Sequence, residues 1–291
     1  MNAWYPQLAF PNGLGVAWPL VARDFPIAVC WAHKSANTTM LKWFLFQTGL
    51  LKQAVAEYPD RIHLFWHAHI TAQPNYGEQC FHALAGPIRK LTVKVVRDPA
   101  HRAVSSFIHF IRDPHVVFHD TWAAFLDWKR SQGLAPTLNA SFSHFLRFVC
   151  DSRADGKPLD HHLQPQWNPA QDPFVMRYIP LEKLGPGLHA LERLCGLRES
   201  PLDALSQSPH HSPPPGQHPW PADAAGMPLD GQLLRQLGGP PASVLLNATT
   251  RPLISEAFTE DYAAYERFYA DFSVRCRDHG APTLDTRCTA A

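Results

Sequence analysis

Residues 26–41 read PIAVCWAHKSANTTML, and the order of residue types in this stretch decides the fold. Pro26–Trp31 is a short apolar run rich in β-forming residues, which predicts a buried strand. Small and polar residues follow, and Thr38–Gln47 then has a helical pattern that Gly49 is placed to stop. The stretch therefore predicts a strand, a tight loop and a helix in direct succession.

Similar signals recur along the chain. Short apolar runs predict further strands at Ile62–Trp66, Leu91–Val96 and Phe174–Ile179. More helices are expected at 120–131, 141–152, 181–195, 229–237 and 256–276. Strands that alternate with helices indicate an α/β domain with a mostly parallel sheet.

The 291 residues are expected to form a single domain, 1–291. Residues 200–228 differ in kind, because they contain Ser-Pro, Pro-Pro-Pro and His-Pro-Trp-Pro and have little periodicity. We interpret them as an irregular, Pro-rich excursion from that domain. Too little chain follows them to build an independent core.

Composition limits the classes of partner. The formal net charge is +1, so no global field attracts nucleic acid or an anionic membrane, and any anion site must be local. No apolar run is long enough to span a bilayer, and the first 20 residues lack the basic region of a signal peptide. Six cysteines without metal-binding spacing favour buried thiols in a reducing compartment, which predicts a cytoplasmic protein.

The loop after the first predicted strand suits a phosphate group. A helix start presents unpaired N–H groups and a partial positive charge, and Lys34 adds a full charge. The Walker pattern GxxxxGK[ST] is absent, which counts against hydrolysis of ATP or GTP. A capped helix with an unrelated lysine before it is the alternative interpretation of these residues.

Residues 34–39, KSANTT, resemble the 5′-phosphosulfate loop of sulfotransferases. They are similar to the K-S-G-T-T form of the cytosolic enzymes, with Ala36 where that form has glycine, and closer to the K-x-A-x-T-S/T form of carbohydrate O-sulfotransferases. The resemblance implies that the donor 3′-phosphoadenosine 5′-phosphosulfate (PAPS) is bound by these six residues: Lys34, Ser35, Ala36, Asn37, Thr38 and Thr39.

Residues 91–107 read LTVKVVRDPAHRAVSSF and form a second motif. Asp98 is a good N-cap and Pro99 a good first helical residue, so a strand is expected to end at Arg97 and a helix to begin. One face of that helix is apolar, and the face opposite is suited to an anion because it has no acidic residue; it carries Arg102, Ser105, Ser106 and His109.

This second motif resembles the R-D-P-x-x-R-x-x-S pattern by which sulfotransferases hold the 3′-phosphate of PAPS. The resemblance implies that Arg97 and Ser105 are direct ligands, the arginine as a charged donor and the serine as a neutral one. Two roles stay open for Arg102: it is a further ligand, or it pairs with an acid that orders the helix.

A histidine pair follows the predicted strand Ile62–Trp66, in the sequence His67-Ala68-His69. The pair is similar to the H-G-H-V stretch of uronosyl 2-O-sulfotransferases, with alanine in place of glycine. The resemblance implies that His69 is the base that takes the proton of the acceptor hydroxyl. Metal binding, together with His63, and a structural role are the alternatives.

Residues 160–166, DHHLQPQ, and the later Glu182-Lys183-Leu184 resemble the H-x-x-P-Q and E-x-L elements of the carbohydrate enzymes. The first element shapes the acceptor cleft in that family, which makes His162 the alternative base. Glu182 is expected to be structural.

The resemblance as a whole implies a P-loop NTPase-like central parallel sheet flanked by helices. It implies a PAPS-dependent O-sulfotransferase, nearest to the uronosyl 2-O-sulfotransferases, that acts on a hydroxyl of a carbohydrate with Lys34 and His69 as catalytic residues. No metal is expected, because Lys34 and Arg97 supply the counter-charge. The alternatives are a P-loop kinase of a small metabolite and a nucleotide-binding protein without catalysis.

Overall fold

The computed structural model describes residues 18–112, 119–157, 159–169, 171–207 and 220–266. Its sheet has three parallel strands in the order β1 (Ile27–Cys30), β2 (Leu91–Val96) and β3 (Arg177–Pro180), with β2 in the centre. Ile27 pairs with Leu91, and Val93 pairs with Arg177. The α/β class with a parallel sheet flanked by helices, expected from the sequence, is confirmed.

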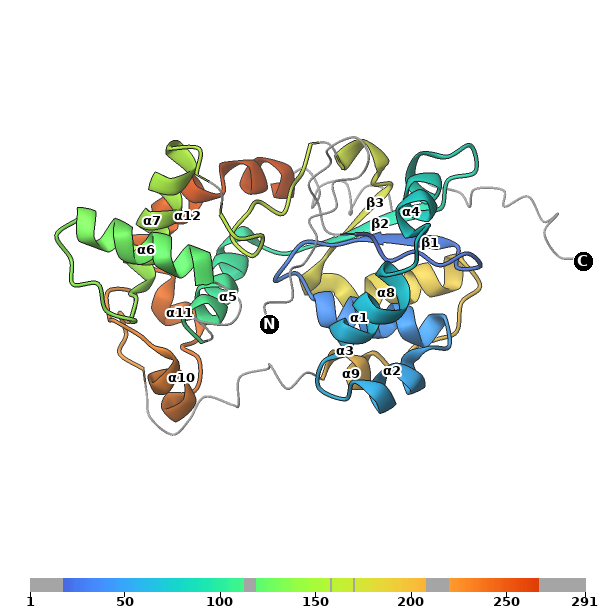
Figure 1. The fold of residues 1–291 in the computed structure, drawn as a ribbon, viewed down its shortest axis with the longest axis horizontal. Helices are drawn as coiled ribbons and strands as arrows, with labels where there is room; N and C mark the ends of the chain where they lie inside the picture. Colours follow the sequence, from blue (N-terminus) through green and yellow to red (C-terminus); the bar gives the residue numbers. More distant parts are fainter. Residues whose placement is uncertain (1–17, 113–118, 158, 170, 208–219, 267–291) are drawn as a thin grey trace, which may run out of the picture.

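The helices that share a core with the sheet come mainly from the first half of the chain and from the segment after β3. They are α1 (Asn37–Gln47), α2 (Leu51–Glu57), α3 (Ile62–Phe65), the π-helix η1 (Trp66–Thr71), α4 (Tyr76–Ala85), α8 (Leu184–Leu194) and α9 (Leu202–Ser206). Figure 1 shows α1 and α8 on the same side of the sheet, where the Trp43 indole donates to Glu192 at 2.7 Å.

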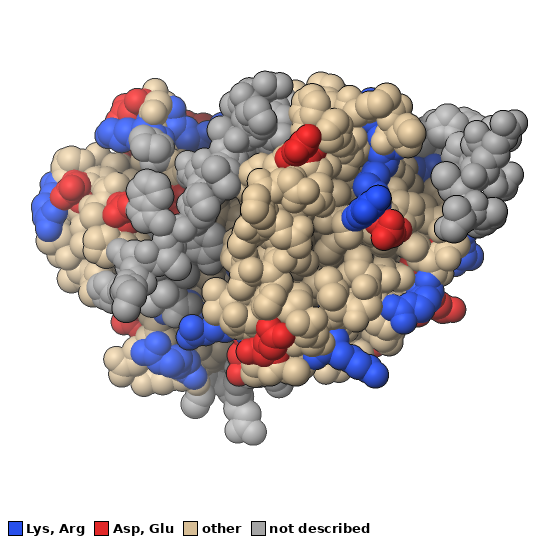
Figure 2. Space-filling view, turned by 45° about the vertical axis from the view of Figure 1, so that its right-hand side comes forward, with Lys and Arg blue, Asp and Glu red and all other residues tan. Residues whose placement is uncertain are grey.

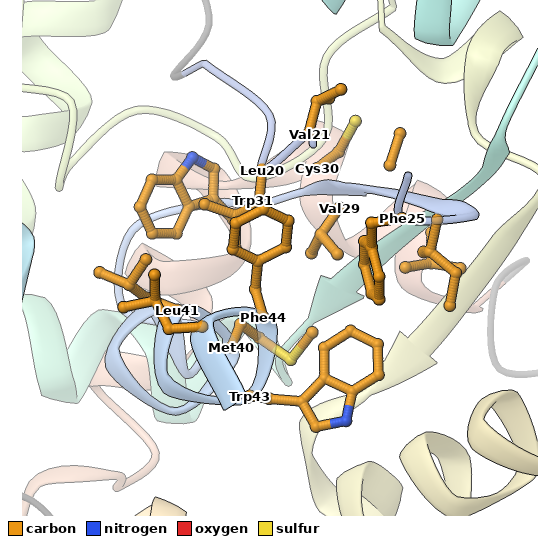
Figure 3. Close-up of a cluster of buried hydrophobic side chains, with 14 of the residues drawn as sticks. Leu20, Val21, Phe25, Val29, Cys30, Trp31, Met40, Leu41, Trp43 and Phe44 are labelled. Atoms are coloured by element: carbon orange, nitrogen blue, oxygen red, sulfur yellow. The ribbon is translucent and has the colours of Figure 1, made fainter. Parts of the chain in front are cut away.

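The core under β1 fixes the first turn of α1. Val29, Met40 and Phe44 are fully buried, and the Phe25 ring meets the Phe44 and Trp43 rings edge-on at 5.3 and 5.7 Å. Figure 3 shows these side chains filling the space between strand and helix. Each large apolar side chain buried in this way contributes about 1.5–3 kcal/mol. The loop between β1 and α1 is therefore held from both ends.

A second group of helices lies at the end of the sheet to which β2 leads (Figure 1). It contains α5 (Pro99–Arg112), α6 (His119–Ser131), α7 (Phe142–Ala154), α10 (Gly231–Leu237), α11 (Ala242–Leu245) and α12 (Thr250–Ala257). Their shared core is aromatic and includes Phe107, Phe110, Phe125, Phe142 and Phe145. The remaining elements are the short 3-10 helices Asp172–Phe174 and Leu181–Lys183 and a helical segment over 259–266.

One predicted strand was wrong. Ile62–Trp66 forms α3, which continues into η1, and not a strand. The buried side chains of this segment are Ile62, Phe65, Trp66 and Ile70, at spacings of i, i+3, i+4 and i+8. That spacing lines one face of a helix, so the apolar stripe packs on the core only in the helical conformation.

The other elements lie close to their predicted positions. The helices predicted at 120–131, 141–152 and 229–237 correspond to α6, α7 and α10, and that at 181–195 to a 3-10 turn followed by α8. The last predicted strand begins later, at Arg177, because 172–174 form a 3-10 turn. The helix predicted at 256–276 is helical over 259–266, and its continuation lies outside the described residues.

The Pro-rich excursion predicted at 200–228 contains α9, and its residues 208–219 lie outside the described residues. Trp220, Ala224 and Ala225, which follow them, are buried in the core of the second helical group. The single domain over 1–291 stays a prediction.

Charged groups are mixed on the surface. On the face in Figure 2, Lys and Arg are interspersed with Asp and Glu, without a broad area of one sign. Within the described residues, no helix combines the length and apolar character needed to cross a bilayer. The described cysteines are free thiols; Cys30 and Cys80 are buried, and Cys150 and Cys195 are half-buried.

Candidate active site

The loop between β1 and α1 has an unusual backbone. Lys34 and Ala36 have φ angles of 67° and 62°, in the left-handed region that costs a non-glycine residue about 1–2 kcal/mol. Ala36 is the N-cap of α1, and no side chain caps this end of the helix. The first-turn N–H groups are therefore available to an anion. The φ angle at Ala36 also explains why glycine suits this position in related loops.

Lys34 lies in a positive environment. Burial, and then the Arg112, Arg97 and Arg102 guanidinium groups, lower the pKa of the Lys34 ammonium to about 8. Positive groups this close to Lys34 disfavour its charged form, and a bound anion would offset that effect. The local anion site expected from the sequence therefore has a physical basis in these four side chains.

The two sequence motifs meet at the carboxyl ends of β1 and β2. The Arg97 guanidinium donates to the Lys34 carbonyl at 3.2 Å. Burial lowers the pKa of Arg97, and nearby Glu182 and Asp98 oppose this shift. Neighbouring parallel strands bring their carboxyl ends to one edge of the sheet, where α/β proteins bind ligands.

The sequence left two roles open for Arg102, a donor ligand or the partner of an acid. The structure shows the second. Its side chain is 1% exposed and donates to the His33 carbonyl at 3.0 Å, to the Gln164 carbonyl at 2.6 Å and to the Asp261 carboxylate at 3.3 Å. Asp261, in segment 259–266, also accepts from the Gln166 and Trp167 backbone N–H groups at 3.0 and 2.9 Å. Arg102 and Asp261 together hold residues 160–167 against the loop between β1 and α1, whose residues 34–39 we call the phosphate loop.

The two serines on the same face of α5 have different surroundings. Ser106 is buried and donates to the His162 carbonyl at 2.8 Å, so its hydroxyl is a structural group. Ser105 is half-buried, two turns along α5 from the Arg97 end. Glu182 accepts from the Asp98 N–H at 3.1 Å and the Tyr265 hydroxyl at 3.0 Å, contacts that suit the structural role expected of it.

The side chains of the phosphate loop turn partly toward the protein. Ser35 is fully buried, and its hydroxyl donates to Gln166 at 3.3 Å. Thr38 contacts the His63 ring at 3.2 Å, and Asn37 contacts the His33 ring at 3.4 Å. Thr39 is half-buried in the first turn of α1.

Because Ile62–Thr71 is helical, the pair His67 and His69 is split. Residues two apart lie about 200° apart around a helix, whereas on a strand they would share a face. His69 stacks on Phe65 at 4.5 Å and pairs with Glu57 at 2.8 Å. Among the residues that the structure describes, His69 makes no hydrogen bond, ion pair or ring contact with residues 34–39. His63, in α3, does contact this loop, through Thr38.

His162 lies beside the phosphate loop. Its ring centroid is 4.4 Å from that of His33, 4.3 Å from His161 and 4.9 Å from His109. Its Nδ1 is 2.6 Å from the Asp160 carboxylate. Burial, then the charges of His161, Lys34 and Arg102, hold the pKa of His162 well below its usual value, so the ring is neutral at pH 7.

Three of these rings also satisfy a spacing that a metal ion could use. One ring nitrogen from each of His33, His161 and His162 lies within 4.8 Å of the others. Lys34 and Arg102 are close enough to depress the His162 pKa, and the same positive field opposes a dication. The arrangement favours an anion over a metal ion.

The sequence suggests His63 only as a metal ligand and Gln166 only as part of the 160–166 element, and it assigns no role to His33 or Asp261. The helical spacing of the apolar residues around His63 was a signal for its position. Asp261 comes from a segment about 160 residues from its Arg102 partner, and no local pattern links the two.

Comparison with known proteins agrees with this geometry. A sequence model described as the sulfotransferase family matches residues 19–197, more than half of the 291-residue chain. Comparisons with individual curated proteins and with solved structures give no significant match. The matched region contains the phosphate loop, the Arg97 motif and the 160–166 loop. The chain belongs to the sulfotransferase family.

Proposed function

We propose that this protein transfers the sulfuryl group of PAPS to a hydroxyl of an acceptor. Membership of the family supports sulfuryl transfer. The observation that carries the proposal is the contact between the two cationic motifs, in which Arg97 from the end of β2 bonds the Lys34 carbonyl of the phosphate loop. Two adjacent anion sites suit a donor that carries phosphate groups at both ends of one nucleoside.

In the proposed complex, the 5′-phosphosulfate lies on the loop 34–39 and the start of α1. Arg97 and Ser105 hold the 3′-phosphate, the first by charge and the second by a hydroxyl donor. We assign Lys34 to the bond that breaks, since this residue belongs to the same loop as the N–H groups that would receive the phosphosulfate.

The reaction is an in-line displacement at sulfur. The acceptor oxygen forms a bond to sulfur while the bond from sulfur to the 5′-phosphate oxygen breaks, and adenosine 3′,5′-bisphosphate leaves. Negative charge grows on that bridging oxygen, where Lys34 stabilises it. The acceptor proton passes to a histidine. The proposed reaction uses no metal, because Lys34 and Arg97 supply positive charge at the two ends of the donor.

Two histidines are candidates for the base, His69 from the resemblance and His162 as its alternative. The contacts favour His162. An N–H at its Nδ1 donates to Asp160, which assigns Nε2 as the basic nitrogen, and the ring is neutral and near Lys34. His69 pairs instead with Glu57 at the end of α2.

We propose a carbohydrate hydroxyl as the acceptor, on the support of the two sequence elements that resemble carbohydrate O-sulfotransferases. In the 160–166 element, the His162 and Gln166 side chains lie at the phosphate loop. A carbohydrate acceptor would therefore approach this loop.

Titration calorimetry with adenosine 3′,5′-bisphosphate, 5′-AMP and ATP tests the donor. We expect the bisphosphate to bind more tightly than 5′-AMP by at least tenfold, and ATP with Mg²⁺ to bind no better than 5′-AMP. Transfer of labelled sulfate from PAPS to a panel of polysaccharides tests the reaction. Equal affinity for the bisphosphate and 5′-AMP would refute the proposed donor. Bisphosphate binding without transfer to any acceptor would favour a non-catalytic binding protein.

A further inference from the structure

One amide joins the two loops of the candidate site. The Gln166 side chain is 2% exposed, and its Oε1 accepts from the Arg97 N–H at 2.8 Å and from the Ser35 hydroxyl at 3.3 Å. Its Nε2 donates to the Arg97 carbonyl at 2.6 Å. The same side chain therefore binds the phosphate loop and the end of β2.

The residue type suits this place. The site needs an acceptor for two donors and a donor for one carbonyl, and within one side chain only an amide offers both groups at this spacing. A carboxylate has no proton to donate to the Arg97 carbonyl. An apolar side chain would remove the partner of the buried Ser35 hydroxyl and of the half-buried Arg97 N–H and carbonyl.

The backbone of Gln166 is fixed independently of these contacts. Its N–H donates to Asp261 at 3.0 Å, and Asp261 in turn pairs with buried Arg102. The backbone of Gln166 is thus held by the segment 259–266, and its side chain holds Ser35 and Arg97 in place.

We propose that Gln166 is a positioning residue that couples the two phosphate sites, so that an anion bound at the Lys34 loop strengthens binding at Arg97 and the reverse. This inference rests on the proposed function, since it assigns those sites to the 5′- and 3′-groups of the donor. An anion on the loop would restrict the motion of Ser35, and the hydrogen bonds of Gln166 would then restrict the Arg97 backbone. The Arg97 guanidinium in turn donates to the Lys34 carbonyl of the same loop. Coupling is reciprocal by thermodynamic necessity.

A cycle of four ligands measures the coupling. Adenosine, 5′-AMP, 3′-AMP and adenosine 3′,5′-bisphosphate are titrated into the full-length protein. The coupling factor is the affinity ratio of bisphosphate to 5′-AMP divided by the ratio of 3′-AMP to adenosine. We expect a factor of about tenfold in the unaltered protein, within the range usual for linked sites.

Gln166→Met keeps the length of the side chain and removes the amide. We expect its coupling factor to fall to about one to twofold, while its adenosine affinity changes less than its bisphosphate affinity. Gln164→Met is the matched control, because Gln164 lies on the same loop and its exposed amide donates to the Leu159 carbonyl at 3.1 Å, away from Ser35 and Arg97. Its coupling factor should equal that of the unaltered protein.

Ser35→Ala supplies a second test if Gln166→Met does not fold. It removes one of the three bonds of the amide and should lower the factor by about two- to threefold. A factor of one in the unaltered protein, or an unchanged factor in Gln166→Met or in folded Ser35→Ala, would overturn the inference. Equal affinity for bisphosphate and 5′-AMP in the unaltered protein would instead refute the donor assignment.

Discussion

Replacing Arg102 by methionine tests whether this buried arginine supports the site or binds the donor. The substitution keeps most of the volume and removes three hydrogen bonds, to the His33 carbonyl, the Gln164 carbonyl and the Asp261 carboxylate. Asp261 is 1% exposed, so its charge would stay buried, with the Gln166 and Trp167 N–H groups as its remaining donors among the described residues.

Loss of one partner of a buried ion pair costs about 3–5 kcal/mol, because the remaining charge is neither hydrated nor paired. We therefore expect Arg102→Met to lower the free energy of unfolding by about that amount. Arg102→Met/Asp261→Asn removes the stranded charge and should recover at least about 1 kcal/mol of the loss, as coupled neighbours do.

The deficit should depend on pH. Burial raises the pKa of Asp261 and Arg102 opposes this, so removing the arginine raises that pKa further. An acid whose folded pKa exceeds its unfolded value destabilises the fold fully above the folded pKa; this penalty shrinks as pH falls below the folded pKa and is gone below the unfolded pKa. Arg102→Met should therefore approach the stability of the unaltered protein as pH is lowered from 7 to about 4.5.

Urea unfolding across this pH range measures the effect, with bisphosphate titration of the folded protein beside it. Arg97→Ala is the comparison, since it removes a proposed ligand. If Arg102→Met unfolds like the unaltered protein but binds bisphosphate as poorly as Arg97→Ala, then Arg102 is a donor ligand and its structural assignment is wrong.

Four more predictions concern the chemistry. His162→Ala should lower kcat by about 10²–10⁴-fold with donor affinity nearly unchanged, and His69→Ala should not; the reverse result would return the base to His69. Arg97→Ala should weaken bisphosphate binding by about 10- to 150-fold and Ser105→Ala by about fivefold, from the bonds lost to a charged or a neutral donor; calorimetry would contradict this if 5′-AMP lost as much. Sulfate transfer should persist in excess EDTA, and loss restored by Zn²⁺ would indicate a metal at the three clustered histidines. Since the pKa of Lys34 is about 8 and a bound anion must raise it, donor binding at pH 8.5 should take up a proton, detectable as a buffer-dependent enthalpy; its absence would count against Lys34 as a contact.

The two segments of the site that come directly after a strand, the loop at Lys34 and the helix start at Asp98, could be predicted from the sequence. An apolar run before Lys34, and Asp98-Pro99 after Arg97, are local signals that depend on a few neighbouring residues. The structure has both the loop and the start of α5 where those signals place them. Parallel pairing of β1 and β2 then brings the two motifs together without further information.

The position of His69 could not be predicted in the same way. A short apolar run such as Ile62–Trp66 suits a strand or a buried helix equally, and only the spacing out to Ile70 separates the two. The error in conformation changes the chemistry, since it moves His67 and His69 to different sides of the element. In its place the fold brings His63 to Thr38.

Gln166 shows a different limit. Its partners Ser35, Arg97 and Asp261 lie about 131, 69 and 95 residues away along the chain. The sequence around a glutamine does not show whether its side chain is buried and hydrogen-bonded to two loops or exposed to solvent. Only the packing of three separate segments gives this amide its role.

The charges around Lys34 divide between folding and binding, and this division explains how a chain of net charge +1 can present a strong anion site. Asp261 neutralises Arg102, and the Arg102 guanidinium N–H groups also donate to the His33 and Gln164 carbonyls. The Arg97 guanidinium bonds a carbonyl, which leaves its charge unneutralised by that contact. Burial, and then the neighbouring arginines, lower the pKa of Lys34. On the face in Figure 2 the charges are mixed in sign, whereas Lys34 and Arg97 lie largely buried at the sheet edge, where the dielectric is low and each charge acts more strongly.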